Sequence, residues 1–301
     1  MVRFYDPSID RKKEQVSKSL HTGHGVIPLP SAIEISPSGT CNRVCAFCPR
    51  SDPDYPDLKE FVTPALLDKL VSQAAEAGFA GIFIFSGFAE PLIDVNIYDL
   101  VALVRRRLPK THIELVTNGD PLNEARLRRL FDSGLSLILI SVYDGPEDFE
   151  RLQALCRDAG LEEGRYVVRK RYLPPEEDFG ITMSNRAGMM ENAEHSRPSL
   201  SQALQRDCYY PSYEFFMDYN GDVLLCAHDW GKKLIVGNLN DRGFMDLWTS
   251  KLMMTVRRRV LNGDRNFDPC RICDVDGTLI GREHADAWLN FMGSPATEEA
   301  G

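Results

Sequence analysis

The sequence predicts an α/β fold, a partial (β/α)6 barrel followed by a small C-terminal α+β domain. Short apolar strands alternate with amphipathic helices between residues 31 and 170, and this alternation indicates a parallel sheet with right-handed crossovers. About five or six such units are too few to close an eight-stranded barrel, so a partial barrel or an open sheet is expected. Beyond residue 200 the pattern changes to a hairpin and a second group of cysteines.

The chain is expected to begin with an extension, residues 1–30, which is charged and holds one short helix. The first strand follows at 33–35 and leads directly into a loop rich in cysteine. A helix is predicted over 63–77, because Thr63 suits the N-cap and Pro64 suits the first helical position. Apolar residues then recur at helical spacing.

The remaining elements of the barrel alternate regularly. Short apolar runs predict strands that are buried on both faces, and the segments between them have the periodicity of helices. In a parallel sheet the functional residues lie at the carboxyl ends of the strands, so we expect a site in the loops that follow them. The expected strands are 81–85, 112–117, 135–142 and 166–168, and the expected helices are 96–108, 122–133 and 146–159.

A turn-rich segment, LPPEEDFG at 173–180, ends this pattern. Farther along, Asn220-Gly221 between two apolar runs predicts a β-hairpin, and a helix is expected at 244–260. We therefore expect the chain to be divided into the extension 1–30, a barrel 31–185, a smaller domain 186–292 and a disordered tail 293–301.

The composition limits the classes of partner and compartment. A formal net charge of −9 predicts no nucleic-acid binding, since phosphate contacts need clustered Lys and Arg. No apolar run approaches the roughly 20 residues of a membrane span, and the N-terminus lacks the apolar core of a signal peptide. We therefore expect a cytoplasmic protein with no membrane partner, whose eight cysteines serve metal or redox chemistry rather than disulfides.

Cys41, Cys45 and Cys48 form a C-x3-C-x2-C group in the first loop. Thiolates at this spacing can bind three irons of a [4Fe-4S] cluster, and the fourth iron can then take a small molecule. A zinc site completed by His21 or His24 is the alternative, although zinc usually takes its cysteines in pairs. The asymmetric triplet therefore favours a cluster.

This group, with Phe47 directly before its last cysteine, resembles the signature of radical S-adenosylmethionine (SAM) enzymes. The resemblance covers about residues 31–170 and implies the partial barrel of that family. It also implies that SAM binds the open iron through its amino and carboxylate groups, with Phe47 among the cofactor-binding residues. Cleavage of SAM by an electron from the cluster would give a 5′-deoxyadenosyl radical that abstracts hydrogen from a substrate.

Other segments that follow strands agree with this resemblance. SGFAEP at 86–91 resembles the family's Gly-Gly-Glu region, of which Gly87 and Glu90 are kept and the second glycine is not. The resemblance implies that Glu90 binds the amino group of SAM. Asn118 and Ser141 end later strands, and each can hydrogen-bond ribose or carboxylate oxygens. For either residue, ordinary turn formation is the alternative, because Asn-Gly and Asp-Gly are common turn dipeptides.

Cys208, Cys226, Cys270 and Cys273 form a second group, which can hold either zinc or a cubane cluster with every corner occupied. The residues around them resemble the C-terminal auxiliary-cluster (SPASM) region of radical SAM enzymes. Because no cysteine follows Cys273, the resemblance is to the short "twitch" form, which holds one auxiliary cluster. It thus implies two [4Fe-4S] clusters together with SAM.

Within that group the cysteine spacing is similar to that of an aminocyclitol dehydrogenase. The resemblance implies oxidation of a sugar or aminocyclitol alcohol to a ketone, with the auxiliary cluster accepting one electron. Arg186 is the predicted catalytic residue, for proton handling or for positioning the substrate, since arginine is a poor base. The implied partners are a small-molecule substrate and a flavodoxin- or ferredoxin-type reductant.

Other functions stay open from the sequence. Maturation of a ribosomal peptide is one, although the 30 residues before the first strand leave little room for a peptide-binding domain. A redox-neutral epimerase or a decarboxylase is another. A zinc-stabilised scaffold without catalysis belongs to a different class, and it would contain no iron.

Overall fold

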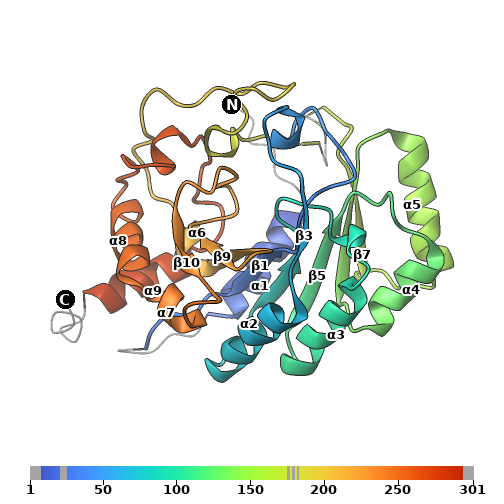
Figure 1. Ribbon diagram of the computed structural model, residues 1–301, viewed down its shortest axis with the longest axis horizontal. Helices are drawn as coiled ribbons and strands as arrows, with labels where there is room; N and C mark the ends of the chain where they lie inside the picture. The colour runs from blue at the N-terminus through green and yellow to red at the C-terminus, as the bar shows by residue number, and fades with distance from the viewer. Residues whose placement is uncertain (1–7, 21–25, 175–176, 178–179, 182, 294–301) are drawn as a thin grey trace.

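The computed structural model describes residues 8–20, 26–174, 177, 180–181 and 183–293. The centre of this described part is an eight-stranded sheet with the order β10-β9-β8-β1-β4-β5-β6-β7 (Figure 1). The strands from β8 to β7 in this order run parallel, whereas β9 and β10 are antiparallel to their neighbours. The predicted α/β class and partial barrel are confirmed. The strands are β1 (Ala32–Ser36), β4 (Ile82–Phe85), β5 (His112–Thr117), β6 (Leu137–Val142), β7 (Tyr166–Lys170), β8 (Glu214–Asp218), β9 (Asp222–Leu224) and β10 (Ile235–Asn238).

Helices in the crossovers cover the outer face of the sheet (Figure 1). Their apolar sides pack against alternate strand residues such as Ile33, Phe83 and Ile113, which are fully buried. The first of these helices begins as predicted, because the Thr63 hydroxyl accepts a hydrogen bond from the Leu66 amide at 3.2 Å. The crossover helices are α2 (Pro64–Glu76), α3 (Ile97–Arg107), α4 (Glu124–Asp132) and α5 (Pro146–Asp158).

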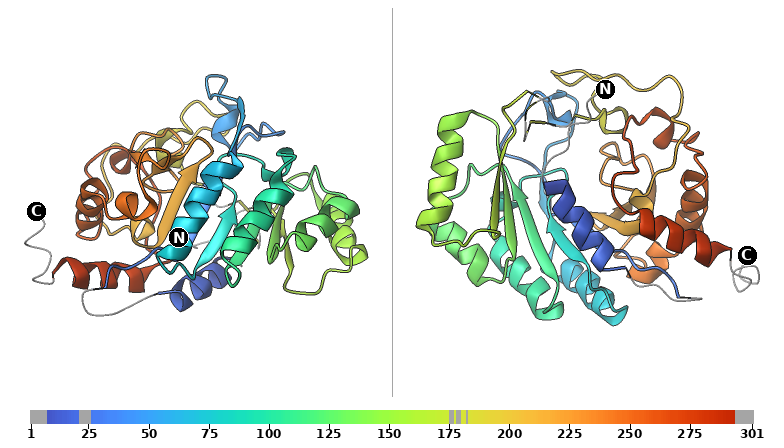
Figure 2. Two further views of the ribbon diagram at one scale, coloured as in Figure 1. Left: turned by 60° about the horizontal axis from the view of Figure 1, so that its bottom comes forward. Right: turned by 180° about the vertical axis from the view of Figure 1, so that it is seen from behind.

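The inner face of the sheet is polar. Glu34 of β1, Glu114 of β5 and Glu214 of β8 are buried there. The helix α1 (Ser8–Lys18) lies across this face (Figure 2) and meets the carboxylates with Arg11 and Lys12. The predicted N-terminal helix is therefore confirmed, but the sequence did not indicate that it enters the barrel.

The C-terminal segment continues the same sheet. β8 pairs in parallel with β1, and β9 then turns back as the predicted hairpin at Asn220-Gly221. The predicted single helix at 244–260 is wrong: α7 (Phe244–Trp248) ends and α8 (Lys251–Val260) begins anew. The break follows from capping, because the Ser250 hydroxyl accepts a hydrogen bond from the Met253 amide at 3.2 Å.

The remaining short elements connect these layers. A small hairpin, β2 (Ser38–Gly39) with β3 (Leu58–Phe61), flanks the first cysteine loop. The sequence did not predict this hairpin, β10 or the last helix, α9. The other helices are α6 (Tyr210–Tyr213), α9 (Arg282–Met292) and the single turns η1 (Pro49–Ser51), η2 (Pro91–Ile93), η3 (Arg186–Gly188) and η4 (Cys270–Ile272).

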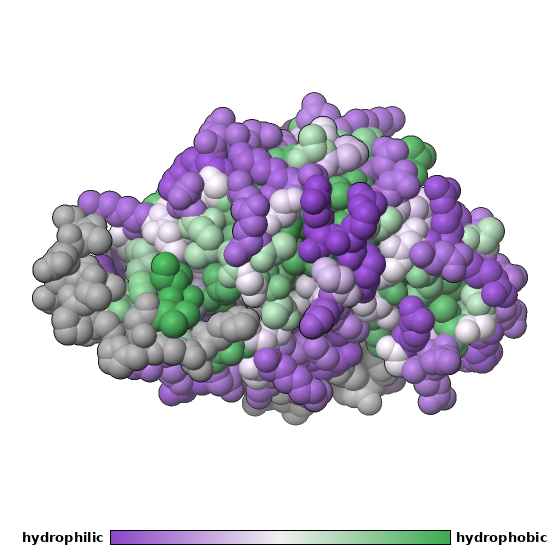
Figure 3. All heavy atoms as spheres, turned by 90° about the horizontal axis from the view of Figure 1, so that it is seen from below, coloured by the Kyte–Doolittle hydropathy of each residue, from purple (hydrophilic) through white to green (hydrophobic). Residues whose placement is uncertain are grey.

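The surface is mainly hydrophilic when seen from below, with apolar side chains in small separate groups (Figure 3). None of the helices in the described ranges is long and apolar enough to cross a membrane. The division at 185/186 stays a prediction, although strands from both sides of it share one sheet. Of the predicted tail, Gly293 is the C-cap of α9, and residues 294–301 lie outside the described residues.

Candidate active site

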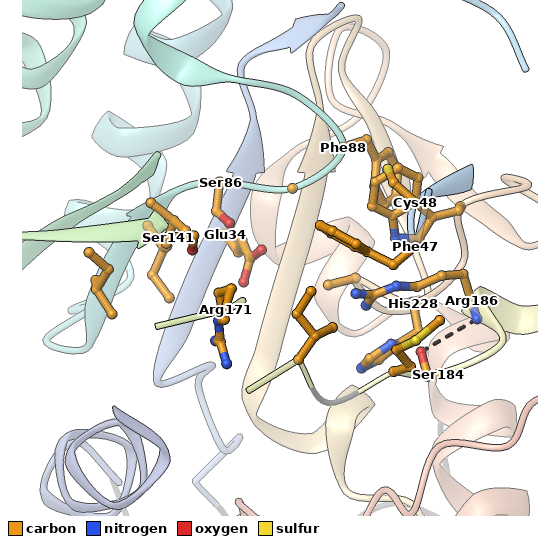
Figure 4. A pocket seen from close by; sticks show the side chains of 18 of the residues that line it. Glu34, Phe47, Cys48, Ser86, Phe88, Ser141, Arg171, Ser184, Arg186 and His228 are labelled. Carbon is orange, nitrogen blue, oxygen red and sulfur yellow. Dashed lines mark hydrogen bonds between the residues drawn. The ribbon is translucent and has the colours of Figure 1, made fainter. Parts of the chain in front are cut away.

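A cavity of about 650 Å³ lies on the inner face of the barrel, between the strand ends and the C-terminal segment (Figure 4). Its wall includes the loop of the first cysteine group and the loops that follow Cys226 and Cys273. Residues predicted from separate segments of the chain thus meet at one cavity. The predicted residues that line it are Cys41, Cys45, Phe47, Cys48, Gly87, Glu90, Asn118, Ser141 and Arg186.

Two arginines fix the first cysteine loop to the ends of the strands. Arg43 donates to Asp120 at 2.6 Å and to Asp144 at 3.0 Å, in the loops after β5 and β6. Arg50 donates to the carbonyl of Phe88 at 2.9 Å, in the loop after β4. The cysteines are therefore held facing the strand ends, where the sequence predicts SAM to bind.

All seven predicted metal ligands are free thiols, and burial raises the pKa of each one. In the first group, burial and then the neighbouring Cys48 raise the pKa of Cys45 to about 11. In the second group, burial and then the other three cysteines hold the pKa of Cys226 well above its usual value. Each group therefore brings its thiols into electrostatic contact. Metal binding would deprotonate them.

Gly87 occupies a position where only glycine fits. Its φ is +77°, and a Cβ there would lie 2.6 Å from the Cβ of Ser36. The next residue, Phe88, donates its amide to the Ser36 hydroxyl at 3.1 Å. The loop after β4 is thus folded tightly against the end of β1, beside the first cysteine group.

Glu90 is the buried anion of this loop, with 2% of its surface exposed. Its carboxylate accepts hydrogen bonds from the Thr117 hydroxyl at 2.7 Å and from the Leu92 and Asn118 amides at 3.0 and 2.8 Å. Burial raises the pKa of Glu90 to about 7, against the effect of these hydrogen bonds. It forms no ion pair with any of the described residues, and such a carboxylate is suited to accept hydrogen bonds from an amino group.

Asn118 both forms a turn and contacts the cysteine loop. Its side-chain oxygen accepts from the Asp120 amide at 3.0 Å, which is the turn geometry that the Asn-Gly dipeptide favours. Its side-chain nitrogen donates to Asn42 at 2.8 Å. The two alternatives for Asn118, turn formation and a place at the cavity, are therefore compatible.

Ser141 and Phe47 lie on the wall of the cavity next to β6 and β7. The Ser141 hydroxyl accepts from the guanidinium of Arg169 at 2.7 Å. The Phe47 ring packs on Tyr143, with ring centres 5.0 Å apart. Arg169 and Ser141 thus supply an adjacent cation and hydroxyl that can hydrogen-bond ribose or carboxylate oxygens, and Phe47 supplies an aromatic face elsewhere on the wall of the same cavity.

The second cysteine group is organised by Arg265, which the sequence did not single out. Its guanidinium is buried and donates to the carbonyls of Arg206, Asp207, Val275 and Asp276 at 2.5 to 3.0 Å. These carbonyls flank Cys208 on one segment and Cys273 on the other. The charge of Arg265 also lowers the pKa of both thiols, although burial, the larger effect, raises it.

Arg186 reaches the cavity from a strained turn. Arg186 and Ala187 have φ values of +47° and +51°, which are uncommon outside glycine and are often kept at functional sites. The guanidinium lies 5.8 Å from the ring centre of Trp230 and has no hydrogen-bond or ion-pair partner among the described residues. Burial and then Arg186 lower the pKa of His228 to about 3, so Arg186 and His228 face the same space (Figure 4).

Sequence reasoning missed the carboxylates of the inner face and the cations that meet them. Glu34 lies in an apolar strand, where an unpaired charge would be strongly unfavourable. A charged residue in such a strand could therefore have predicted that Glu34 has a partner. Arg43 and Arg50, inside and beside the cysteine motif, gave no comparable signal. His21 and His24, the alternative zinc ligands, lie outside the described residues.

Comparisons with known proteins agree with this geometry. Residues 35–169 match the model of the radical SAM superfamily, and residues 208–274 match that of an iron-sulfur cluster-binding domain, SPASM. The S-adenosyl-L-methionine-dependent 2-deoxy-scyllo-inosamine dehydrogenase of Niallia circulans is 29% identical over 245 residues, which are 81% of this chain and 92% of that protein.

Solved structures with the same fold contain a bound SAM. BtrN in complex with AdoMet and 2-DOIA has a TM-score of 0.71 at 25% identity, over 85% of this chain and 98% of that one. For anSMEcpe with bound AdoMet the TM-score is 0.52 at 16% identity, over 90% of this chain and 95% of that one, which supports the fold alone. The chain therefore carries a radical SAM domain followed by a C-terminal iron–sulfur cluster-binding domain of the SPASM type, and it is an enzyme similar to a SAM-dependent dehydrogenase.

Proposed function

We propose that this enzyme oxidises a carbinol of a sugar or aminocyclitol to a ketone, with SAM as the radical source and an auxiliary [4Fe-4S] cluster as the electron acceptor. The observation that carries the proposal is the shared cavity. Its wall joins the predicted SAM-binding residues to the loops that follow Cys226 and Cys273, so a substrate inside it would adjoin both centres. The Niallia circulans relative, named as a dehydrogenase of 2-deoxy-scyllo-inosamine, supports the same class of reaction.

The cysteines present suit two iron–sulfur clusters. The first group offers three thiols and leaves one iron open, and the second offers four. In the described part of the chain, no three metal-binding side chains surround a position where a single metal ion would fit. A cubane does not need such an arrangement, because each of its irons takes one thiolate. Arg265 adds to the fit, because its charge favours the thiolate forms of Cys208, Cys270 and Cys273 against the effect of burial.

SAM, held at the first cysteine group and Glu90, would supply the radical that takes a hydrogen atom from the carbinol carbon, and the substrate would then have to lose one proton and one electron to become a ketone. We assign Arg186 to the carbinol oxygen, because a cation beside that oxygen favours loss of its proton. Phe88 and Trp230 pack with ring centres 4.7 Å apart and exclude water from this part of the wall. The cysteines of the second group are not among the lining residues, which suits a centre that accepts the electron without binding substrate.

The two binding functions belong to different segments of the chain in this proposal. Residues 31–185 would bind SAM, and residues 186–292 would hold the auxiliary cluster. The first electron has to come from another protein, and we propose a flavodoxin- or ferredoxin-type reductant for this role.

The first test is anaerobic reconstitution, with counting of iron and sulfide, followed by incubation with SAM and a chemical reductant. We expect about eight irons per chain, four for each cubane, and release of 5′-deoxyadenosine. Zinc without iron, or iron without cleavage of SAM, would contradict the assignment of the first cluster.

The second test separates the two centres. In a Cys270→Ala/Cys273→Ala variant we expect SAM cleavage to persist while ketone formation from 2-deoxy-scyllo-inosamine or a panel of related polyols is lost. Cys156→Ala is the matched control, because this buried cysteine belongs to neither group. If the double variant still forms ketone at the wild-type rate, the second cluster is not the electron acceptor. If the wild-type enzyme cleaves SAM but oxidises none of the panel, the proposed substrate class is wrong.

A further inference from the structure

Helix α1 places one ammonium group between two buried carboxylates of the inner face. Lys12 Nζ lies 3.1 Å from Glu214 Oε2 and 3.7 Å from Glu34 Oε2. The side chain of Glu214 is fully buried and that of Glu34 is 11% exposed, so two carboxylates in this low-dielectric region would repel each other without a cation between them. Burial lowers the pKa of Lys12, but Glu214 and Glu34 together raise it above its usual value, so the ammonium form is kept.

Each carboxylate also reaches one of the two functional loops. Glu34 lies next to Ser86 in the loop predicted to bind SAM (Figure 4), lines the cavity together with Ser86 and Gly87, and has its pKa lowered by both residues against the larger effect of burial. Glu214 Oε1 accepts from the amide of Ala227 at 3.4 Å, directly after Cys226. A chain of contacts therefore runs from the SAM loop through Lys12 to the second cysteine group.

A second ion pair holds α1 in this place. Arg11, next to Lys12 on the helix, donates to Glu114 Oε2 of β5 at 2.9 Å and also contacts the other carboxylate oxygen. Two neighbouring residues of α1 are thus bound to different strands, Arg11 to β5 and Lys12 to β8 and β1. Together these contacts fix the position of Lys12.

We propose that Lys12 is a positioning residue, whose ammonium group ties Glu34 to Glu214 and so fixes the SAM-binding loop relative to the auxiliary cysteine loop. This inference rests on the proposed function, because it requires SAM at the first loop and a cluster at the second. It concerns a helix outside the segments that match the family models.

The test is Lys12→Met in the reconstituted enzyme, with Lys13→Met as the matched control at the adjacent exposed position. Binding of SAM is measured without reductant, and the midpoint potential of the auxiliary cluster is measured by a redox titration followed by EPR. We expect SAM to bind about tenfold more weakly in Lys12→Met, the size of effect seen when an outer-shell partner is lost. The auxiliary potential should become more negative, because a nearby cation is gone. Lys13→Met should change neither value, and Lys12→Arg should restore both.

Lys12→Met leaves two unpaired buried carboxylates and can fail to fold, so a Lys12→Met/Glu214→Gln variant is the second measurement. This variant removes the repulsion between Glu34 and Glu214 but does not restore the ammonium group that links them. We therefore expect SAM binding to stay weak. Wild-type affinity in this double variant would overturn the inference, because cancelling charge would then be the whole role of Lys12. A Lys12→Met enzyme identical to Lys13→Met would also overturn it. If wild-type protein itself fails to bind SAM, the proposed function fails first, and the inference fails with it.

Discussion

Glu90 combines two opposing requirements in one side chain. It is buried, which raises its pKa to about 7, yet it accepts N–H hydrogen bonds from the amino group of SAM most strongly when it is ionised. The ionised fraction of such a group rises about tenfold between pH 6 and pH 8. We therefore expect the dissociation constant of SAM to fall by about tenfold over that interval, measured by equilibrium dialysis of the reconstituted enzyme at constant ionic strength.

The control for this pH dependence is Glu90→Gln, which cannot ionise, compared with Glu60→Gln at an exposed position on β3. We expect weak binding and a flatter pH profile in the first variant, and the wild-type profile in the second. The same steep profile in Glu90→Gln would mean that a different group, in the protein or in SAM, is responsible.

Single residues differ in how far the sequence could predict them. The cysteine groups were predictable because their spacing is local and specific, and Glu90 because it follows a strand within a family motif. Lys12 was not predictable, because its partners Glu34 and Glu214 come together only through the pairing of β1 with β8, and Glu214 lies 202 residues away from it. Only the folded sheet determines which side chains share its inner face.

At the scale of elements, the second cysteine group has little regular structure of its own. Arg265 takes over part of the role of secondary structure by donating to four backbone carbonyls around Cys208 and Cys273. In Arg265→Met these buried carbonyls lose their partner, which is unfavourable for each one, and the thiolates lose a nearby cation. We expect iron to fall from about eight to about four atoms per chain, with SAM binding retained.

Arg206→Met is the matched control, because Arg206 forms an ion pair with Asp276 in the same region but is largely exposed and contributes little. It should keep its full iron content. A variant of Arg265 that also keeps about eight irons per chain would show that the cysteine segments hold their arrangement without it.

The strands and helices of the barrel could be predicted from local sequence patterns, whereas those of the C-terminal segment could be predicted only in part. β5 has the predicted bounds, 112–117, because an apolar run between turns leaves few alternatives. The helix predicted at 244–260 is divided because Ser250 serves as an N-cap in the middle of an apparently continuous pattern. β10 is short and irregular, with a bulge between Ile235 and Gly237, so it lacks the alternation that predicts a strand.

At the scale of the whole molecule, the sheet does not stop at the predicted boundary at 185/186. β8 pairs with β1 along its whole length, and the buried Phe215 and Met217 of β8 belong to the same core as Ile33 and Ile35 of β1. Parallel pairing between such distant segments leaves no local trace in the sequence. This is why the sequence predicted two domains and not the shared sheet.

The shared sheet leads to a prediction about truncation. A chain that ends at residue 205 lacks β8, so β1 becomes an edge strand with unpaired backbone groups and an uncovered apolar face. We expect this fragment to aggregate and to show no cooperative thermal transition by circular dichroism. Co-expression with the fragment 206–301 should restore a complex that unfolds cooperatively, as judged by size-exclusion chromatography and melting. A monomeric 1–205 fragment that melts cooperatively would instead mean that the barrel folds alone, and that the pairing of β8 with β1 joins two independently stable units.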